Sequence, residues 1–356
     1  MKTGKNIQEL VTELQRQQSE KRDYISPADA LQLRDDGRTL TMRNQNFKAT
    51  SLFHRQMGDA LGIPAKYYDK MQQTKPALLA ENVNSWLSDK EQSYMVRTLS
   101  GAARALLSDR YRRIDNLEVA SAVLPIFAGQ QDMEVMSSDV TEQKMYIKIV
   151  SKRIEAKCVG DVVQAGVAIS NSEVGMGAVS VLPLVYTLKC SNGMIVNSLA
   201  ERKTHLGRAV KGLEDFGIIS DEAAEAEDRA FLLKLRDIVH NAFDEARFTQ
   251  IVATMEKSAE AKITGRVTNV VELTARTYSL NDGEQEGILK YLIEGGDLSL
   301  YGLGNAITRA SQDIGSYDRA TQLEGIGWNV ITMPEKQWKV INAERISFCK
   351  FLAKYT

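Results

Sequence analysis

Basic side chains concentrate in three segments of the chain, and the first of these is rich in arginine. Residues 97–113 hold Arg97, Arg104, Arg110, Arg112 and Arg113 against a single acid, Asp109. Cations grouped in this way neutralise the phosphates of a nucleic acid and release its condensed counterions, which is a main source of affinity for a polyanion. The segment therefore predicts contact with a nucleic-acid backbone.

The second basic segment lies on a predicted strand at residues 144–152, where apolar and basic side chains alternate. One face carries Lys144, Tyr146, Lys148 and Lys152, and the other carries Met145, Ile147 and Ile149. We expect Tyr146, together with Tyr111 of the first segment, to stack on unpaired bases. The alternative is an ordinary solvated face whose lysines pair with Asp132, Glu134, Asp139 and Glu142.

The third basic segment lies between residues 202 and 211 and contains no acid. It contributes Arg202, Lys203, His205 and Arg208 to the predicted phosphate contacts. The three segments must converge in the fold for a nucleic-acid surface to exist, because phosphate binding needs several cations held in register.

A loose pattern of two acids and a lysine supports hydrolysis as an alternative function. Asp139, Glu155 and Lys157 resemble the arrangement of metal-dependent nucleases, in which two carboxylates hold Mg²⁺ and the lysine stabilises the attacking water or the phosphate. Another explanation is that Glu155 neutralises a neighbouring cation.

The sequence lacks the other common catalytic and cofactor motifs. In the run GRAVKG at residues 207–212 the lysine precedes the last glycine, so the phosphate-cradling GxxxxGK[ST] loop is absent. The loop at residues 171–177 lacks the third glycine of a dinucleotide fingerprint. Cys158, Cys190 and Cys349 are too far apart for a zinc site of ordinary spacing. We therefore predict no catalytic residue, no metal and no cofactor.

The composition is that of a soluble globular protein. Of the 356 residues 43% are apolar and 26% are charged, and the formal net charge is −1, so only the location of the charge favours a polyanion. Isolated cysteines fit a reducing cytoplasm. No window approaches the roughly 18 apolar residues of a membrane span, so we expect no membrane association.

Periodicity and turn residues predict the elements that position these segments. Residues 7–20 form an amphipathic helix, Asp35, Asp36 and Gly37 close a hairpin, and Ser51 begins the first of three helices up to residue 86. A strand at 94–99, a helix at 116–127 and strands at 157–169 and 179–190 follow. One long helix is predicted at 221–262, followed by further helices that Gly302, Gly304, Gly315, Gly325 and Gly327 separate.

These elements predict an α+β fold with three regions. Residues 1–90 form a small mixed region, residues 91–220 a sheet-plus-helix core with a basic face, and residues 221–356 a mainly helical region. The core sheet is antiparallel and long helices pack on it.

Three local runs resemble a known family of mobile genetic elements. LSDRYRRIDN at residues 107–116, LKCSNGM at 188–194 and YGLGNAITRA at 301–310 are similar to the phage/plasmid-like protein family, a domain of unknown function carried by phages, prophages and conjugative plasmids. The resemblance covers most of the chain from about Phe53. It implies a protein of the host bacterial cytoplasm and supplies no activity.

The order of elements in the core resembles a second group of proteins. A helix, three strands and a helix after a basic segment are similar to the β-β-β-α core of single-strand annealing proteins such as RecT and the Rad-type recombination mediators. The run VQAGVAIS at residues 163–170 stands where those proteins have their third strand. The resemblance implies rings or filaments that hold DNA in a positive groove.

These observations lead to one main functional prediction. We expect a non-enzymatic, self-assembling protein that binds and anneals single-stranded DNA in recombination or replication. Its further partners would be a single-stranded-DNA-binding protein or an exonuclease. A protein that inhibits a host defence or repair factor is another alternative, with the acidic run from Asp221 to Asp228 as a DNA-like surface, although such a run also suits the start of a helix.

Overall fold

The computed structural model describes residues 1–111, 114–197 and 221–343. The fold is α+β, as predicted, and it contains two sheets. The first sheet has six strands in the order β1-β5-β6-β4-β3-β2 and is mixed, because β4 and β6 run parallel. Its strands are β1 (Arg22–Pro27), β2 (Gln32–Leu33), β3 (Thr39–Met42), β4 (Gln45–Ala49), β5 (Ser93–Leu99) and β6 (Ala102–Ser108).

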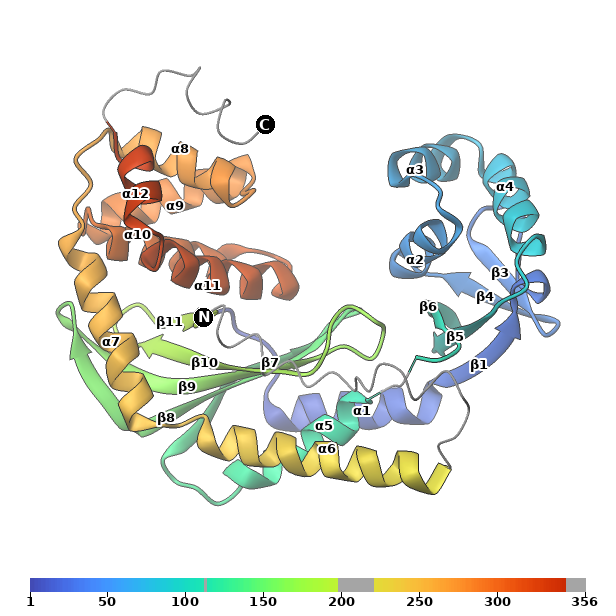
Figure 1. Cartoon of the computed structure of the whole chain (residues 1–356), viewed down its shortest axis with the longest axis horizontal. Coiled ribbons are helices and arrows are strands. Elements are labelled where there is room, and N and C mark those ends of the chain that lie inside the picture. The colour runs from blue at the N-terminus through green and yellow to red at the C-terminus, as the bar shows by residue number, and fades with distance from the viewer. Residues whose placement is uncertain (112–113, 198–220, 344–356) are drawn as a thin grey trace.

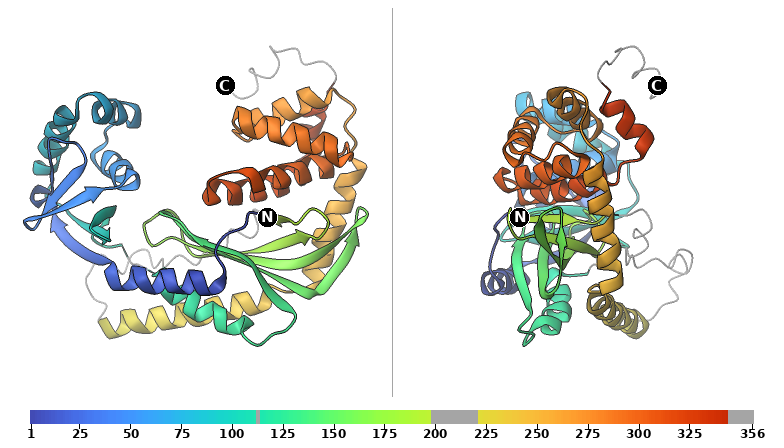
Figure 2. Two further views of the ribbon diagram at one scale, coloured as in Figure 1. Left: turned by 180° about the vertical axis from the view of Figure 1, so that it is seen from behind. Right: turned by 90° about the vertical axis from the view of Figure 1, so that its left-hand side faces the viewer.

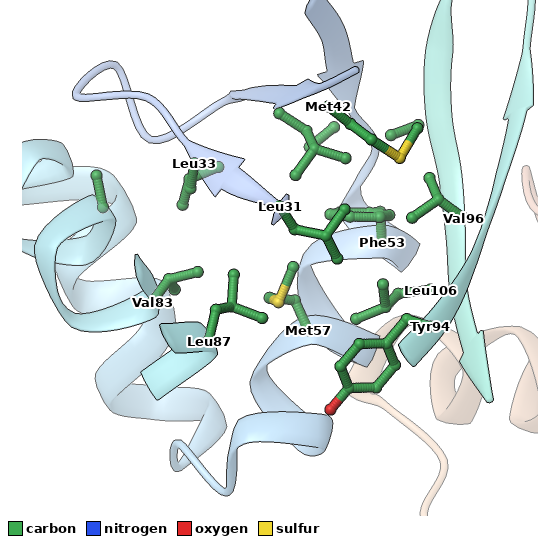
Figure 3. Packing of buried hydrophobic residues seen from close by; sticks show 14 of the residues in the cluster. Leu31, Leu33, Met42, Phe53, Met57, Val83, Leu87, Tyr94, Val96 and Leu106 are labelled. Carbon is green, nitrogen blue, oxygen red and sulfur yellow. The ribbon is translucent and has the colours of Figure 1, made fainter. Parts of the chain in front are cut away.

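Three helices cover one face of the six-stranded sheet and form the first core with it. They are α2 (Ser51–Leu61), α3 (Ala65–Thr74) and α4 (Pro76–Ser88). Leu31 and Met42 from the strand side meet Phe53, Met57 and Leu87 from the helices (Figure 3). The predicted hairpin joins β2 and β3, and Gly37 adopts the positive φ of 60° that its turn requires.

The six-stranded sheet crosses the boundary that we expected at residue 90. Strands β5 and β6 lie beyond that boundary and pair with β1 and β4. The first helix, α1 (Ile7–Glu20), packs away from this sheet, and its Leu10 and Leu14 join the core of the second sheet. Elements that are neighbours in the first hundred residues of the chain therefore belong to the cores of two different sheets.

The second sheet is an antiparallel meander of five strands in the order β11-β10-β9-β8-β7. These are β7 (Met133–Val140), β8 (Met145–Cys158), β9 (Asp161–Asn171), β10 (Ser180–Thr187) and β11 (Asn192–Ile195). The sequence did not predict β7, which is half apolar and half polar and whose two buried residues are Ser137 and Ser138. Strand β8 also runs past residue 152, because its hairpin turn lies at Val159 and Gly160.

Helices cover both faces of the five-stranded sheet. On one face α1, α5 (Asn116–Phe127) and α6 (Asp221–Asn241) pack on Met145, Ile147 and Ile149. The other face meets α10 (Leu300–Ala310) and α11 (Tyr317–Ile331), which Figures 1 and 2 show above the sheet. The first half of β8, residues 145–151, therefore has no free face.

The C-terminal region is helical, as predicted, but the long helix expected at 221–262 is two helices. Helix α6 ends at Asn241 and α7 (Glu245–Glu260) begins after Asp244, whose side chain accepts a hydrogen bond from the Arg247 N–H at 2.6 Å. Helices α8 (Val267–Thr277), α9 (Asp282–Gly295) and α12 (Glu335–Ile341) complete this region. Figure 1 shows α8–α12 and α2–α4 at opposite ends of the molecule.

Within the described ranges, none of the helices combines the length with the apolar composition that a bilayer span requires.

Candidate nucleic-acid interface and a second cleft

Two arginines of the first basic segment are internal and belong to an ion-pair network. Arg97 is 2% exposed and donates to Asp23 at 2.8 Å and to Asp115 at 2.9 Å. Arg104 pairs with Glu173 at 2.7 Å, and Lys21 pairs with Asp115 at 2.6 Å. We call these six residues the ionic joint. Their three positive and three negative charges pair with one another. Arg97 and Arg104 were expected on a basic surface, but they are internal and do not form one.

The ionic joint connects elements from both sheets. Asp23, Arg97 and Arg104 lie on β1, β5 and β6, while Asp115 caps α5 and Glu173 follows β9. Burial would raise the pKa of Asp115, but Arg97 and Lys21 lower it below its usual value. Asp115 is therefore ionised as a partner of two cations, and the network is a permanent structural contact at neutral pH.

The second basic segment is also mostly covered. The Nζ of Lys148, a residue that is 1% exposed, donates to Glu324 at 2.6 Å and to the Thr321 hydroxyl at 3.1 Å. The Tyr146 hydroxyl donates to Asp318 at 2.8 Å. All three partners belong to α11. The prediction of an exposed basic face here was wrong, because α11 packs on the face that carries these side chains.

Among the basic side chains predicted at residues 144–152, Lys152 is the exposed one, since Lys144 is half-buried and Lys148 is buried. The Lys152 ammonium pairs with Glu134 at 2.6 Å, and its side chain is 58% exposed. This matches the alternative explanation of a solvated lysine paired with a neighbouring acid. Exposed pairs of this kind contribute about 0–1 kcal/mol to stability.

Six of the predicted contact residues lie outside the described ranges. They are Arg112, Arg113, Arg202, Lys203, His205 and Arg208. Their predicted contacts with phosphate therefore stay predictions.

The remaining predicted residues border one exposed loop. The Tyr111 hydroxyl donates to the carbonyl of Ser172 at 3.2 Å, and the Ser172 hydroxyl donates to the carbonyl of Gln143 at 2.8 Å. These bonds bring the segment after β6 and the turn between β7 and β8 to the loop after β9. We call Arg110, Tyr111, Lys144 and residues 175–178 the glycine-loop patch.

The glycine-loop patch combines a cation with open backbone. Gly175 and Gly177 have φ values of 79° and 139°, and neither they nor Ala178 are buried. A Cβ atom at Gly177 would lie 3.4 Å from the Nζ of Lys144, so this ammonium lies directly beside bare backbone. No described residue forms an ion pair with Lys144. An anion can approach such a surface closely.

The three residues of the nuclease alternative do not converge. Asp139 pairs with Lys5 at 2.8 Å and lies opposite Tyr146. Glu155 and Lys157 lie nine and eleven residues beyond Tyr146 on β8, which corresponds to roughly 30 Å or more of strand length at about 3.3 Å per residue. Two carboxylates at that distance cannot ligate one Mg²⁺, whose ligand distances are about 2.1 Å. The structure therefore contradicts this grouping.

No three His, Cys, Asp or Glu side chains gather to hold a metal ion in the part of the chain that the structure describes.

A cleft of about 720 Å³ lies where two of the three family-like runs meet. The turn from β10 to β11 and α10 form two of its walls, and the Asn192 side chain donates to Asn305 Oδ1 at 2.9 Å between them. Gln312 donates to Asn192 Oδ1 at 2.6 Å. The turn from β8 to β9 and the end of α9 complete the lining. We call this the hairpin–helix cleft.

Sequence reasoning missed the hairpin–helix cleft, although two of its walls were already distinctive runs. Its volume is in the range of small-molecule sites, which is about 300–1,000 Å³. The available signal was the pair of runs at 188–194 and 301–310. Nothing in a linear sequence indicates that two runs so far apart share a wall.

A scan against protein-family models, a search of curated proteins and a search of solved structures each found no match for this chain. Both resemblances inferred from the sequence therefore stay predictions.

Proposed function

We propose that the protein binds single-stranded nucleic acid without cutting it, and that the glycine-loop patch is a contact point for the phosphate backbone. The observation that carries this proposal is the Lys144 ammonium beside Gly177. The half-buried Tyr111 and the exposed Arg110 lie on the segment after β6, which the Tyr111 hydroxyl connects to the same loop at Ser172. Cations along the phosphate backbone and aromatic rings on which bases stack are the two components of sequence-independent strand binding. Backbone without side chains lets a phosphate approach the loop closely.

The proposal places fewer cations at the interface than the sequence did. Arg97, Arg104 and Lys148 are excluded, because leaving a buried carboxylate without its partner would be strongly unfavourable. Strand annealing and assembly into rings or filaments remain part of the proposal. Annealing needs no cofactor, because base pairing between complementary strands supplies the free energy.

Salt dependence of oligonucleotide binding tests the proposal. We expect the affinity of the full chain for a fluorescent oligothymidylate, measured by anisotropy between 50 and 200 mM salt, to fall steeply as salt rises. Lys144→Gln should weaken binding and reduce the log–log slope by about 0.7, since one neutralised phosphate is lost. A strand-annealing assay with and without Mg²⁺ would then separate annealing from binding alone.

Lys152→Gln is the matched control, because Lys152 lies on the adjoining strand but pairs with Glu134. This variant should bind as the unmodified protein does. The proposal fails if the unmodified chain does not bind at low salt, if its affinity is independent of salt, or if the two variants have equal slopes.

A further inference from the structure

The end of α9 makes one corner of the hairpin–helix cleft electronegative. The last turn of α9 contains Glu294 and no basic residue, and Asp297 follows the helix. A helix C-terminus carries a partial negative charge, so a cation normally occupies its last turn. An acid at this position opposes the helix dipole, and a cation from outside would relieve the unfavourable charge of Glu294. Asp297 has one partner inside the protein, because the Lys262 Nζ lies 3.5 Å from its Oδ1, but its Oδ2 is buried without a hydrogen-bond partner among the described residues.

A tyrosine hydroxyl without a partner among the described residues opens into the cleft from the same wall. Tyr301 lines the cleft and is 5% exposed, yet its hydroxyl has no hydrogen bond to any residue that the structure describes. Burial raises its pKa, and the charges of Asp161, Cys190 and Asp297 act in the same direction, so the hydroxyl stays protonated beside these cleft residues. The ring is packed in the protein while the hydroxyl is not a buried atom, so the hydroxyl can bond to a ligand in the cleft.

The two basic residues that line the cleft, Arg309 and Lys189, make different contacts. The Arg309 guanidinium lies 4.5 Å from the centre of the Tyr291 ring and 3.7 Å from Asp313. Lys189 is exposed, and its backbone N–H donates to Asp161. The Asp161 carboxylate thus accepts hydrogen bonds from backbone N–H groups of Val162 and Lys189. By contrast, no described residue forms an ion pair with Glu294.

Exposed aliphatic side chains belong to the segments that line the cleft. Val159 is 40% exposed, and Leu188, Ile293 and Leu298 are exposed beside the lining residues Lys189, Glu294 and Asp297. An aliphatic stem that ends in a charged group would contact such side chains with its methylenes.

From these observations we propose that the hairpin–helix cleft binds an aliphatic cation, with an alkylammonium or guanidinium group at Glu294 and Asp297 and a hydrogen bond to the Tyr301 hydroxyl. Two sources share this chemistry, namely the side chain of a lysine or arginine in a peptide and a free polyamine. The site is separate from the glycine-loop patch and does not depend on nucleic-acid binding.

Calorimetric titration of the full chain with spermidine, and separately with the peptide acetyl-Leu-Arg-Leu-amide, tests the inference. We expect saturable binding of at least one probe. Glu294→Gln should weaken it roughly tenfold to hundredfold, as expected for a lost hydrogen bond to a charged group. Tighter binding of the peptide would identify a protein side chain as the source, and tighter binding of spermidine a polyamine.

Two matched controls distinguish a site from a general charge effect. Glu286→Gln removes an exposed acid of the same helix outside the cleft, so binding should be retained. Tyr301→Phe should weaken binding without lowering the free energy of unfolding, because its hydroxyl has no internal partner. Tyr317→Phe should do the opposite, since the Tyr317 hydroxyl bonds to Ser137 at 2.7 Å.

The inference is overturned if neither probe binds, or if Glu294→Gln and Glu286→Gln weaken binding equally. Equal weakening would show that net charge, and no built site, attracts the cation. Because oligonucleotide binding should be unchanged in Glu294→Gln, failure here is distinguishable from failure of the proposed function.

Discussion

Individual charged residues in this protein have roles that depend on burial more than on charge. Lys148 and Glu324 are 1% and 0% exposed and neutralise each other between β8 and α11. The Lys148 ammonium also lies 4.7 Å from the centre of the Tyr317 ring. Removing either partner would leave an uncompensated charge in the interior, which is a far larger effect than loss of a surface cation. A lysine in a basic run can thus be a core residue.

A second effect at the scale of one residue is that the buried His54 makes the stability of the fold depend on pH. It is 5% exposed, its Nδ1 lies 2.9 Å from the Tyr68 hydroxyl, and burial lowers its pKa from 6.5 to about 4. The unfolded chain therefore binds a proton near pH 6.5 that the folded chain excludes. Stability should be full above pH 6.5 and fall towards pH 4, by up to about 3 kcal/mol.

Urea unfolding at several pH values between 7.5 and 4.5 measures this effect, with His54→Gln as the comparison. The variant has no titrating group at this position, so its stability should fall less over the same range. Parallel pH curves for the two proteins would show that His54 is not responsible.

At the scale of elements, glycines in the C-terminal region permit close packing. We predicted that Gly304 and Gly327 separate helices, but they lie inside α10 and α11. A Cβ at Gly304 would lie 2.8 Å from the carbonyl oxygen of Gly327, and a Cβ at Gly327 would lie 2.9 Å from that of Gly304. The two backbones approach each other only because neither residue has a side chain.

Gly327→Ala should therefore destabilise the protein by about 1–3 kcal/mol, because the added methyl group overpacks the contact between α10 and α11. Chemical denaturation followed by circular dichroism gives this free energy. The control is Gly315→Ala, at a position where an added Cβ meets nothing within 4 Å. Its stability should be unchanged or slightly higher. Equal effects of both substitutions would contradict the packing argument.

At the scale of the whole molecule, the ionic joint connects the two sheets. Arg97 on β5 reaches Asp115 at the start of α5, and its Nη1 donates to the Glu173 carbonyl at 2.6 Å. One buried guanidinium thus connects the six-stranded sheet to the start of α5 and to the loop between β9 and β10 of the second sheet. The relative position of the two halves depends on these few polar contacts together with a small apolar cluster around Leu107 and Val174.

Arg97→Met should lower the free energy of unfolding by about 3–5 kcal/mol, because Asp23 and Asp115 would lose a shared buried partner. Arg16→Met is the matched control. Arg16 also contacts two acids, Glu13 and Glu20, each at 2.7 Å, but its side chain is 43% exposed. Its loss should cost about 0–1 kcal/mol. Urea unfolding of both variants measures these changes. Similar losses in the free energy of unfolding would refute the structural role of the ionic joint.

Local patterns predicted most elements because they depend on nearby residues. The apolar stripe of Leu10 and Leu14 correctly predicted α1, and Gly37 and Gly62 mark the turn and the helix end where positive φ is required. Strand β7 was missed because its apolar and polar residues do not alternate, since the adjacent Val135 and Met136 are followed by three polar residues and the register shifts there. The α6–α7 break was missed because helical spacing continues across Asp244.

The amino-acid sequence by itself determined the α+β class, most helices and strands, and the absence of the common nucleotide and zinc motifs. Only the tertiary structure decided which side chains meet. Alternation places Lys148 on one face of a strand, but whether that face meets water or α11 depends on a helix near the other end of the chain. The same long-range packing removes Arg97 from the surface, leaves Lys144 beside Gly177, and joins two distant runs in one cleft.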